Sequence, residues 1–205
     1  MNEKSGNPQN KKYTCSQTPV WEHNLIMRSR YKFTEISDHL YFLTWTIVGK
    51  IKIFVNQKYC DIIIKNFEFY RRNKNLKIFY YVIMDHHIHM IVSHPKDIET
   101  VIQNIKGFTA KEIIGSMKSG REKEILETLK LLKKKYKIKS TYQLWQEGSY
   151  PKIISSLQML HQKIMYIHQN PVKRGFVSEP EDWCYSSARN FAGKSNPFEV
   201  DELEL

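Results

Sequence analysis

The chain has few of the features that mark secreted, disulfide-stabilised or membrane proteins. Its three cysteines, Cys15, Cys60 and Cys184, are widely spaced and form no Cys-x-x-Cys pair. This excludes a disulfide framework and a cysteine-based zinc site, and favours reduced thiols. No run of about 18 apolar residues occurs and the first residues are polar, so we expect neither a membrane span nor a secretory signal. These absences together favour a cytoplasmic location.

Acidic residues are also in the minority. The 205 residues include 32 Lys and Arg against 21 Asp and Glu, which gives a formal net charge of +11. The length fits one domain with a substantial core, and 13% aromatic residues exclude wholesale disorder. A basic protein of this kind favours a polyanionic partner such as nucleic acid, although many soluble proteins are basic without binding it.

Hydrophobic periodicity predicts alternating strands and helices. We expect strands at 40–48, 78–84, 87–93 and 142–146, and helices at 56–72, from Asp97 onward, at 121–139 and from 155 or 156 to about 169. Residues 115–120 are predicted to form a flexible turn, and Asn170-Pro171 to end the last helix. This order predicts an α+β fold, a ferredoxin-like antiparallel sheet with helices packed on it.

The chain is expected to consist of an arm, one domain with an insertion, and a tail. Residues 1–35 are predicted to be an N-terminal arm, and 36–195 the domain. A basic helical insertion is expected at about 115–140, and an acidic C-terminal tail at 196–205. The tail is predicted to be either an exposed terminus or a cover over the groove that would bind nucleic acid.

Two histidines lie in the middle of an apolar strand. On an extended strand His87 and His89 project from the same face, about 6–7 Å apart, whereas His86 is expected on the opposite face. The pair suits two imidazoles that bind one divalent ion. Two ligands alone do not make a metal site, and a pair of ordinary half-buried histidines would show the same pattern.

The last predicted helix supplies candidate partners for the pair. Tyr166 and Asn170 are four residues apart and therefore share one face of the helix. Over the histidine strand, Asn170 can offer its carbonyl oxygen as a third metal ligand. Tyr166 can hold its phenol at a metal-bound phosphate, where the cation would orient the phosphorus for attack.

A run of lysines marks the region after residue 129. Such a run is as readily a solvated face as a binding surface, and the overall positive charge keeps the second interpretation open. Our candidate nucleic-acid-binding residues are Lys130, Lys133, Lys134, Lys135 and Arg174.

These motifs resemble a known family. His87-Ile88-His89 resembles the HUH motif, in which a bulky hydrophobic residue separates two histidines. The stretch 166–177 looks like the Tyr-Ile-His-x-Asn-Pro-Val-x-x-Gly-x-Val signature of single-tyrosine HUH transposases, most closely the REP-associated tyrosine transposases. Residues 145–148 and 183–189 look like further family blocks. The resemblance spans roughly residues 38–193.

The resemblance implies a role for each site residue. It implies that His87, His89 and Asn170 bind Mg²⁺ or Mn²⁺, and that Tyr166 becomes linked to a DNA 5′-phosphate and leaves a free 3′-OH. It also implies a single-stranded DNA partner that contains a hairpin, and either a homodimer or a monomer. One departure is Asp85-His86, where the family usually has Pro-Asn.

Three functions remain open from the sequence. The first is a transposase-type endonuclease and strand transferase. The second is a domesticated protein that binds DNA hairpins without cutting them, and the third is an unrelated basic RNA-binding domain. The intact set of histidines, tyrosine and asparagine favours the enzyme, because a mere binder has no need for a nucleophile beside a metal.

Overall fold

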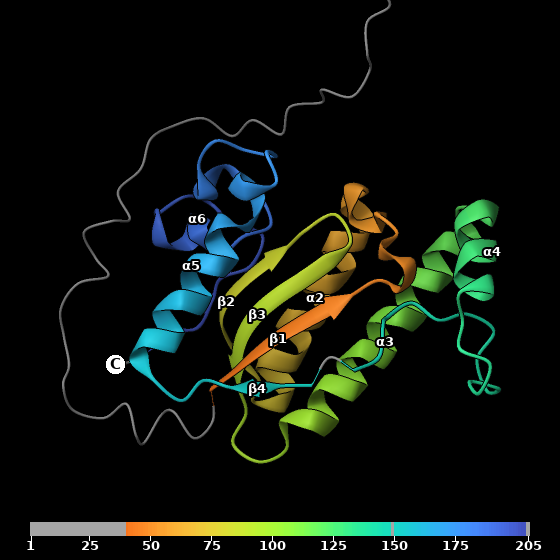
Figure 1. The fold of residues 1–205 in the computed structure, drawn as a ribbon, viewed down its shortest axis with the longest axis horizontal. Coiled ribbons are helices and arrows are strands. Elements are labelled where there is room, and N and C mark those ends of the chain that lie inside the picture. Colours follow the sequence, from red (N-terminus) through yellow and green to blue (C-terminus); the bar gives the residue numbers. More distant parts are fainter. Residues whose placement is uncertain (1–39, 149, 204–205) are drawn as a thin grey trace, which may run out of the picture.

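The computed structural model describes residues 40–148 and 150–203, so the predicted arm at 1–35 lies outside the described residues. Its centre is a four-stranded antiparallel sheet with the strand order β2-β3-β1-β4. The strands are β1 (Leu40–Thr46), β2 (Lys77–Ile83), β3 (His87–Ser93) and β4 (Lys152–Ile153). The predicted α+β fold with an antiparallel sheet is confirmed (Figure 1).

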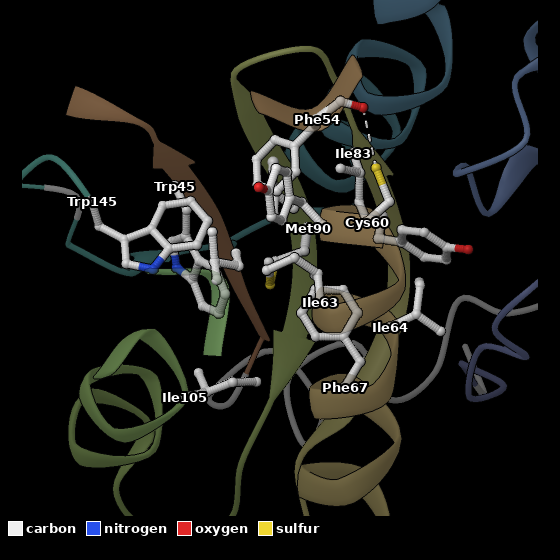
Figure 2. Close-up of a cluster of buried hydrophobic side chains, with 14 of the residues drawn as sticks. Trp45, Phe54, Cys60, Ile63, Ile64, Phe67, Ile83, Met90, Ile105 and Trp145 are labelled. Carbon is white, nitrogen blue, oxygen red and sulfur yellow. Dashed lines mark hydrogen bonds between the residues drawn. The ribbon is translucent and has the colours of Figure 1, made fainter. Parts of the chain in front are cut away.

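Two helices cover one face of this sheet. They are α2 (Gln57–Lys74) and α3 (Ile98–Ser119), and a shorter helix, α4 (Lys123–Leu131), packs outside them. The core between sheet and helices includes Trp45, Phe67 and Met90 (Figure 2). Burial of this apolar surface is the main force that fixes α2 against the sheet. Figure 2 also shows the Cys60 thiol, which donates to the carbonyl of Phe54 over 3.3 Å.

The opposite face carries one long helix, α5 (Leu157–Lys173), on the other side of the sheet from α2 (Figure 1). Its apolar stripe is Leu160, Ile164 and Ile167, which pack with Phe42 and Val82 of the sheet. Ser156 caps the helix by accepting a hydrogen bond from the Met159 amide, which satisfies one of the free amides of the first turn. Tyr166 lies beside this stripe on α5 and faces β3.

Short 3₁₀ and α segments complete the fold. They are η2 (Val48–Lys50), η3 (Ile53–Val55), η4 (Pro180–Asp182) and α6 (Ala188–Phe191). No helix among the described residues is long and apolar enough to cross a membrane.

The predicted turn at 115–120 is wrong, because α3 continues through it to Ser119. Ile113 and Met117 carry on the buried stripe of the helix, and Gly115 lies on its exposed side. A glycine on a solvent-facing position lowers helix propensity by only about 1 kcal/mol, which the buried stripe outweighs. The helix predicted at 121–139 is shorter than expected, since α4 ends at Leu131 and the lysine-rich run that follows forms turns.

Two further boundaries differ from prediction. The strand expected at 142–146 contributes only a single bridge, between Ile47 and Trp145, and the fourth strand is β4. Pro171 does not end α5, which continues for two more residues to Lys173. Proline has no N–H to donate to the carbonyl four residues before it, and α5 extends for only these two residues beyond it.

The end of the chain packs along β2, which is an edge strand of the sheet. The amide of Ser187 donates to the Tyr81 carbonyl over 3.0 Å, and that of Asp201 to the Ile78 carbonyl over 2.9 Å. Asp201 also pairs with Arg71 at 2.9 Å, and the Phe198 side chain is buried in the core. The expectation of an exposed tail is therefore wrong around Phe198 and Asp201, because the buried ring and the paired carboxylate hold this segment against the domain.

Candidate metal and tyrosine site

The histidine face of β3 looks toward α5. Because side chains alternate along a strand, His87 and His89 share this face with Thr44 and Thr46 of β1, which are their register partners. Ile88 and Met90 point the other way into the core beneath α2. The two apolar residues thus fix the strand while the two imidazoles face the helix.

The two imidazoles and the phenol of Tyr166 form one cluster. The ring centroids of His87 and His89 are 4.7 Å apart, and those of His89 and Tyr166 are 4.8 Å apart. Phe42 stacks on His89 at 5.6 Å and meets Tyr166 edge-on at 6.0 Å. Two segments almost 80 residues apart in the sequence therefore place a tyrosine beside the histidine pair. Tyr166 remains 42% exposed and can be reached from solvent.

Unpartnered nitrogen atoms make the imidazoles suitable metal ligands. Nδ1 of His87 and Nε2 of His89 are buried and have no hydrogen-bond partner among the described residues. The other nitrogen of His89, Nδ1, lies 2.8 Å from the hydroxyl of Thr44. When Nδ1–H donates to this hydroxyl, the lone pair of Nε2 is left for a metal, as is usual for metal-binding histidines. Buried polar atoms without partners are costly, and an ion would satisfy both.

The protonation state of the pair also fits metal binding. Burial, followed by the neighbouring His86, lowers the pKa of His87 to about 4. Burial, followed by His87 and Lys163, lowers the pKa of His89 to about 3. Both rings are therefore neutral at pH 7, which is the form that coordinates metals.

His86 does not lie apart from the pair, and our expectation that it would was wrong. Asp85 and His86 form the turn between β2 and β3, so the strict alternation of a strand does not apply to them. The His86 ring lies 4.5 Å from that of His87, and its Nδ1 is 2.6 Å from a carboxylate oxygen of Asp85. Donor atoms of Asp85, His86 and His87 lie within 4.8 Å of one another, a group able to hold a metal ion.

Asn170 follows Tyr166 by one turn of α5 and is buried. Its backbone carbonyl accepts a hydrogen bond from the Arg174 amide at the end of the helix. The ring contacts of the site link His87, His89 and Tyr166. The role of Asn170 as a metal ligand stays a prediction. His168 points to the other side, where its Nε2 lies 2.9 Å from the buried hydroxyl of Ser187, so it is a structural histidine.

Positive side chains surround the cluster. Arg174 lies 3.9 Å from Asp85, and Lys52 lies 3.6 Å from the same carboxylate. Lys163 places its ammonium 4.8 Å from the ring centroid of Phe42, and Lys50 acts electrostatically on His87. Of these, only Arg174 was predicted from the sequence. Lys163 could have been found, because it precedes Tyr166 by three residues on one helix.

The predicted lysine cluster lies elsewhere. Lys130 belongs to α4, and the other three lysines follow it in turns. In Figure 1, α4 and α5 lie at opposite ends of the long axis of the molecule, with the sheet and α3 between them. The structure therefore does not bring Lys130, Lys133, Lys134 and Lys135 to the imidazoles, and their contact with DNA stays a prediction.

Comparison with known proteins gives a family and a fold. The model of the IS200-like transposase family matches residues 35–147, a range that includes both histidines and ends before Tyr166. No curated protein matches the sequence. Among solved structures, that of a REP-associated tyrosine transposase bound to a REP hairpin is similar, with a TM-score of 0.55 and 18% identity. This likeness covers 86% of the present chain and 93% of that chain, and at such low identity it shows the shared fold.

The family match covers more than half of the chain and contains the strand on which the candidate metal ligands lie. The resemblance noticed in the sequence is thereby confirmed at the level of the family. The segment 115–140, expected to be an insertion, falls within the matched range. The chain belongs to the family of IS200-like transposases.

Proposed function

We propose that the chain is a metal-dependent, single-tyrosine transposase that nicks single-stranded DNA and transfers the cut strand. The observation that supports this most directly is the 4.8 Å separation of the Tyr166 and His89 rings. The family match contains the histidines but stops before the tyrosine, so the convergence of the two in space is independent support.

Tyr166 is the proposed nucleophile. Its oxygen attacks the phosphorus of a phosphodiester, a P–O bond to Tyr166 forms, and the bond from phosphorus to the 3′-oxygen breaks. The phenol loses its proton, the leaving 3′-oxygen gains one, and the products are a 5′-phosphotyrosine and a free 3′-OH. A second 3′-OH can reverse this step and join strands without ATP, since the energy of the broken ester is kept in the phosphotyrosine.

His87 and His89 would hold the divalent ion, with Asn170 as a third ligand and Mg²⁺ or Mn²⁺ as the metal. When bound there, the ion would polarise the phosphoryl oxygen and neutralise the charge that develops on it. The hydroxyl of Thr44 orients His89 for this purpose. Imidazole ligands suit Mn²⁺ better than Mg²⁺, which prefers oxygen donors, so we propose Mn²⁺ as the better activator in vitro.

The proposed substrate is a single DNA strand that contains a hairpin. The structurally similar transposase was solved with a REP hairpin, and the positive groups around the site, Lys50, Lys52, Lys163 and Arg174, suit a DNA backbone. Both the histidines and Tyr166 come from one chain. This supports a site that one chain completes by itself, without a tyrosine from a neighbouring subunit.

Covalent capture of DNA tests the proposal. The protein is incubated with end-labelled, hairpin-bearing single strands and Mn²⁺, and adducts are separated on denaturing gels. We expect an adduct with the native chain and with Tyr150→Phe, an exposed tyrosine that serves as a matched control. We expect none with Tyr166→Phe, because the nucleophilic oxygen is missing.

Two other outcomes would change the conclusion. An adduct that persists in Tyr166→Phe would refute this nucleophile. Specific retention of the hairpin without any adduct would instead support the domesticated hairpin-binding protein. Mixing His87→Ala with Tyr166→Phe distinguishes the assemblies, since recovered adducts would require a site shared between two subunits and would refute the single-chain site.

A further inference from the structure

An aromatic pair lies just beyond the nucleophile helix. Phe176 stacks on Trp183, with ring centroids 5.3 Å apart and an angle of 26° between the planes. Phe176 is nevertheless 40% exposed. None of the roles assigned above uses this pair, and a large apolar ring held partly in solvent needs a reason.

The pair is held by two rigid elements. Phe176 follows Gly175, whose φ of 68° turns the chain at the end of α5, and the Phe176 amide donates to the Pro171 carbonyl over 3.0 Å. The indole N–H of Trp183 donates to the carbonyl of Ile83, the last residue of β2, over 2.8 Å. The stacked rings therefore connect the end of α5 to the end of β2 and have little freedom to reorient.

This position is next to the metal and tyrosine site. Ile83 is two residues before Asp85, whose carboxylate lies beside His86. Arg174, two residues before Phe176, reaches the same carboxylate at 3.9 Å and keeps 46% of its side chain exposed. A guanidinium and an aromatic ring thus stand together at the end of the sheet where the imidazoles lie.

We propose that Phe176 and Trp183 form a stacking site for an unpaired nucleobase of the DNA strand, next to the phosphate that is cut. Arg174 binds a backbone phosphate beside that base. Aromatic rings that bind unstacked bases, together with a cation for the backbone, are the usual way in which proteins hold single strands. The inference rests on the proposed function. Charge favours DNA as the occupant because Lys173 and Arg174, exposed just before Phe176, outnumber the one exposed acid between the two rings, Glu179, while Asp182 beside Trp183 is paired with Lys194.

The test is a coupling experiment between one side chain and one base. All proteins carry Tyr166→Phe and are kept in EDTA, so that binding is measured by fluorescence anisotropy without cleavage. Each nucleotide flanking the hairpin is replaced in turn by an abasic residue. We expect one position at which the abasic strand binds about 5- to 150-fold more weakly, the range that a base–aromatic stack contributes.

Phe176→Ala should bind the intact strand as weakly as the parent protein binds that abasic strand, and should show no further loss with it. Phe176→Leu, which keeps apolar bulk without a ring face, should behave like the alanine variant. Phe191→Ala is the matched control, because Phe191 is also an exposed ring stacked on a partner, Tyr80, at 5.0 Å. It should bind both strands like the parent protein.

Unchanged binding by folded Phe176→Ala would overturn the proposal. So would abasic substitutions that weaken binding by Phe176→Ala as much as they weaken binding by the parent protein at every position. Full binding by Phe176→Leu would point to an apolar contact in place of stacking, and would also overturn it. Failure here is distinguishable from failure of the proposed chemistry. Adduct formation at Tyr166 without coupling to Phe176 would refute only the base site, whereas coupling without an adduct would refute only the nucleophile.

Discussion

Thr44 offers a sharp test of the metal site, because it touches a proposed ligand without being one. Its hydroxyl lies 2.8 Å from Nδ1 of His89, the nitrogen opposite the unpartnered Nε2. Thr44→Val keeps the shape of the side chain and removes this hydrogen bond. His89 then loses the partner that fixes its tautomer and ring orientation.

Removal of such a partner typically lowers metal affinity 10- to 100-fold, or about 1.4–2.8 kcal/mol. We therefore expect the dissociation constant for Mn²⁺, measured by calorimetry at pH 7.5 without DNA, to rise by that factor in Thr44→Val. At this pH His87 and His89 are neutral in both proteins, since burial holds their pKa values at about 4 and about 3. Competition between protons and metal therefore does not contribute to the difference.

Thr46→Val is the matched control. Thr46 lies two residues further on the same strand and face, is similarly half-buried, and pairs in register with His87. Among the described residues its hydroxyl makes no hydrogen bond to an imidazole. If Thr44→Val binds Mn²⁺ as tightly as the native chain and Thr46→Val, Thr44 does not orient a metal ligand.

Three further predictions concern acid stability, the C-terminal segment and the lysines. In EDTA the free energy of unfolding should fall as the pH drops from 6.5 toward 4. In this range the unfolded chain binds protons at His87 and His89, whereas the folded chain does not, because burial lowers the pKa of both. His87 alone accounts for about 3 kcal/mol, so urea titrations should show a smaller loss for His87→Asn; an equal loss would contradict the lowered pKa. Phe198→Ala should cost about 3–5 kcal/mol in thermal or urea unfolding, since this ring is fully buried. Exposed Glu202→Gln should change it by less than about 0.5 kcal/mol, and equal effects would show that the segment is not bound down. Replacing Lys130, Lys133, Lys134 and Lys135 by Gln should reduce the slope of log DNA affinity against log salt concentration by about 0.7 for each phosphate that is no longer neutralised. The cut position should not move. An unchanged slope would show that these lysines are solvated and do not contact DNA.

Much of the fold was readable from the sequence where local pattern and packing agree. The bounds of β3 are those predicted, because its apolar residues are buried on both faces and its ends carry turn residues. The helix at 57–74 was predicted within two residues because its buried positions recur at three and four. Errors fell where a single residue type was given too much weight, as with Gly115 within α3 and Pro171 within α5.

The site was only partly readable for a different reason. His87, His89 and Tyr166 could be named because their spacing and the resemblance both pointed to them, and the structure brings the three rings together. Thr44 and Lys50 could not, because strand register decides which residues face the imidazoles, and register does not show in the sequence. His86 was misplaced because a turn, unlike a strand, sets no fixed direction for its side chains.

The bonds between the C-terminal segment and β2 have a consequence for the order of folding. Ser187 and Tyr81 are 106 residues apart in the chain, and Asp201 and Ile78 are 123 apart. After β2 has been synthesised, more than a hundred further residues must be added before Ser187 and Asp201 can bond to its outer edge. Contacts of such long range form late, so the nascent chain carries an open sheet edge throughout synthesis of α5. Release of the chain within that interval would therefore yield a product with an exposed sheet edge, which favours aggregation.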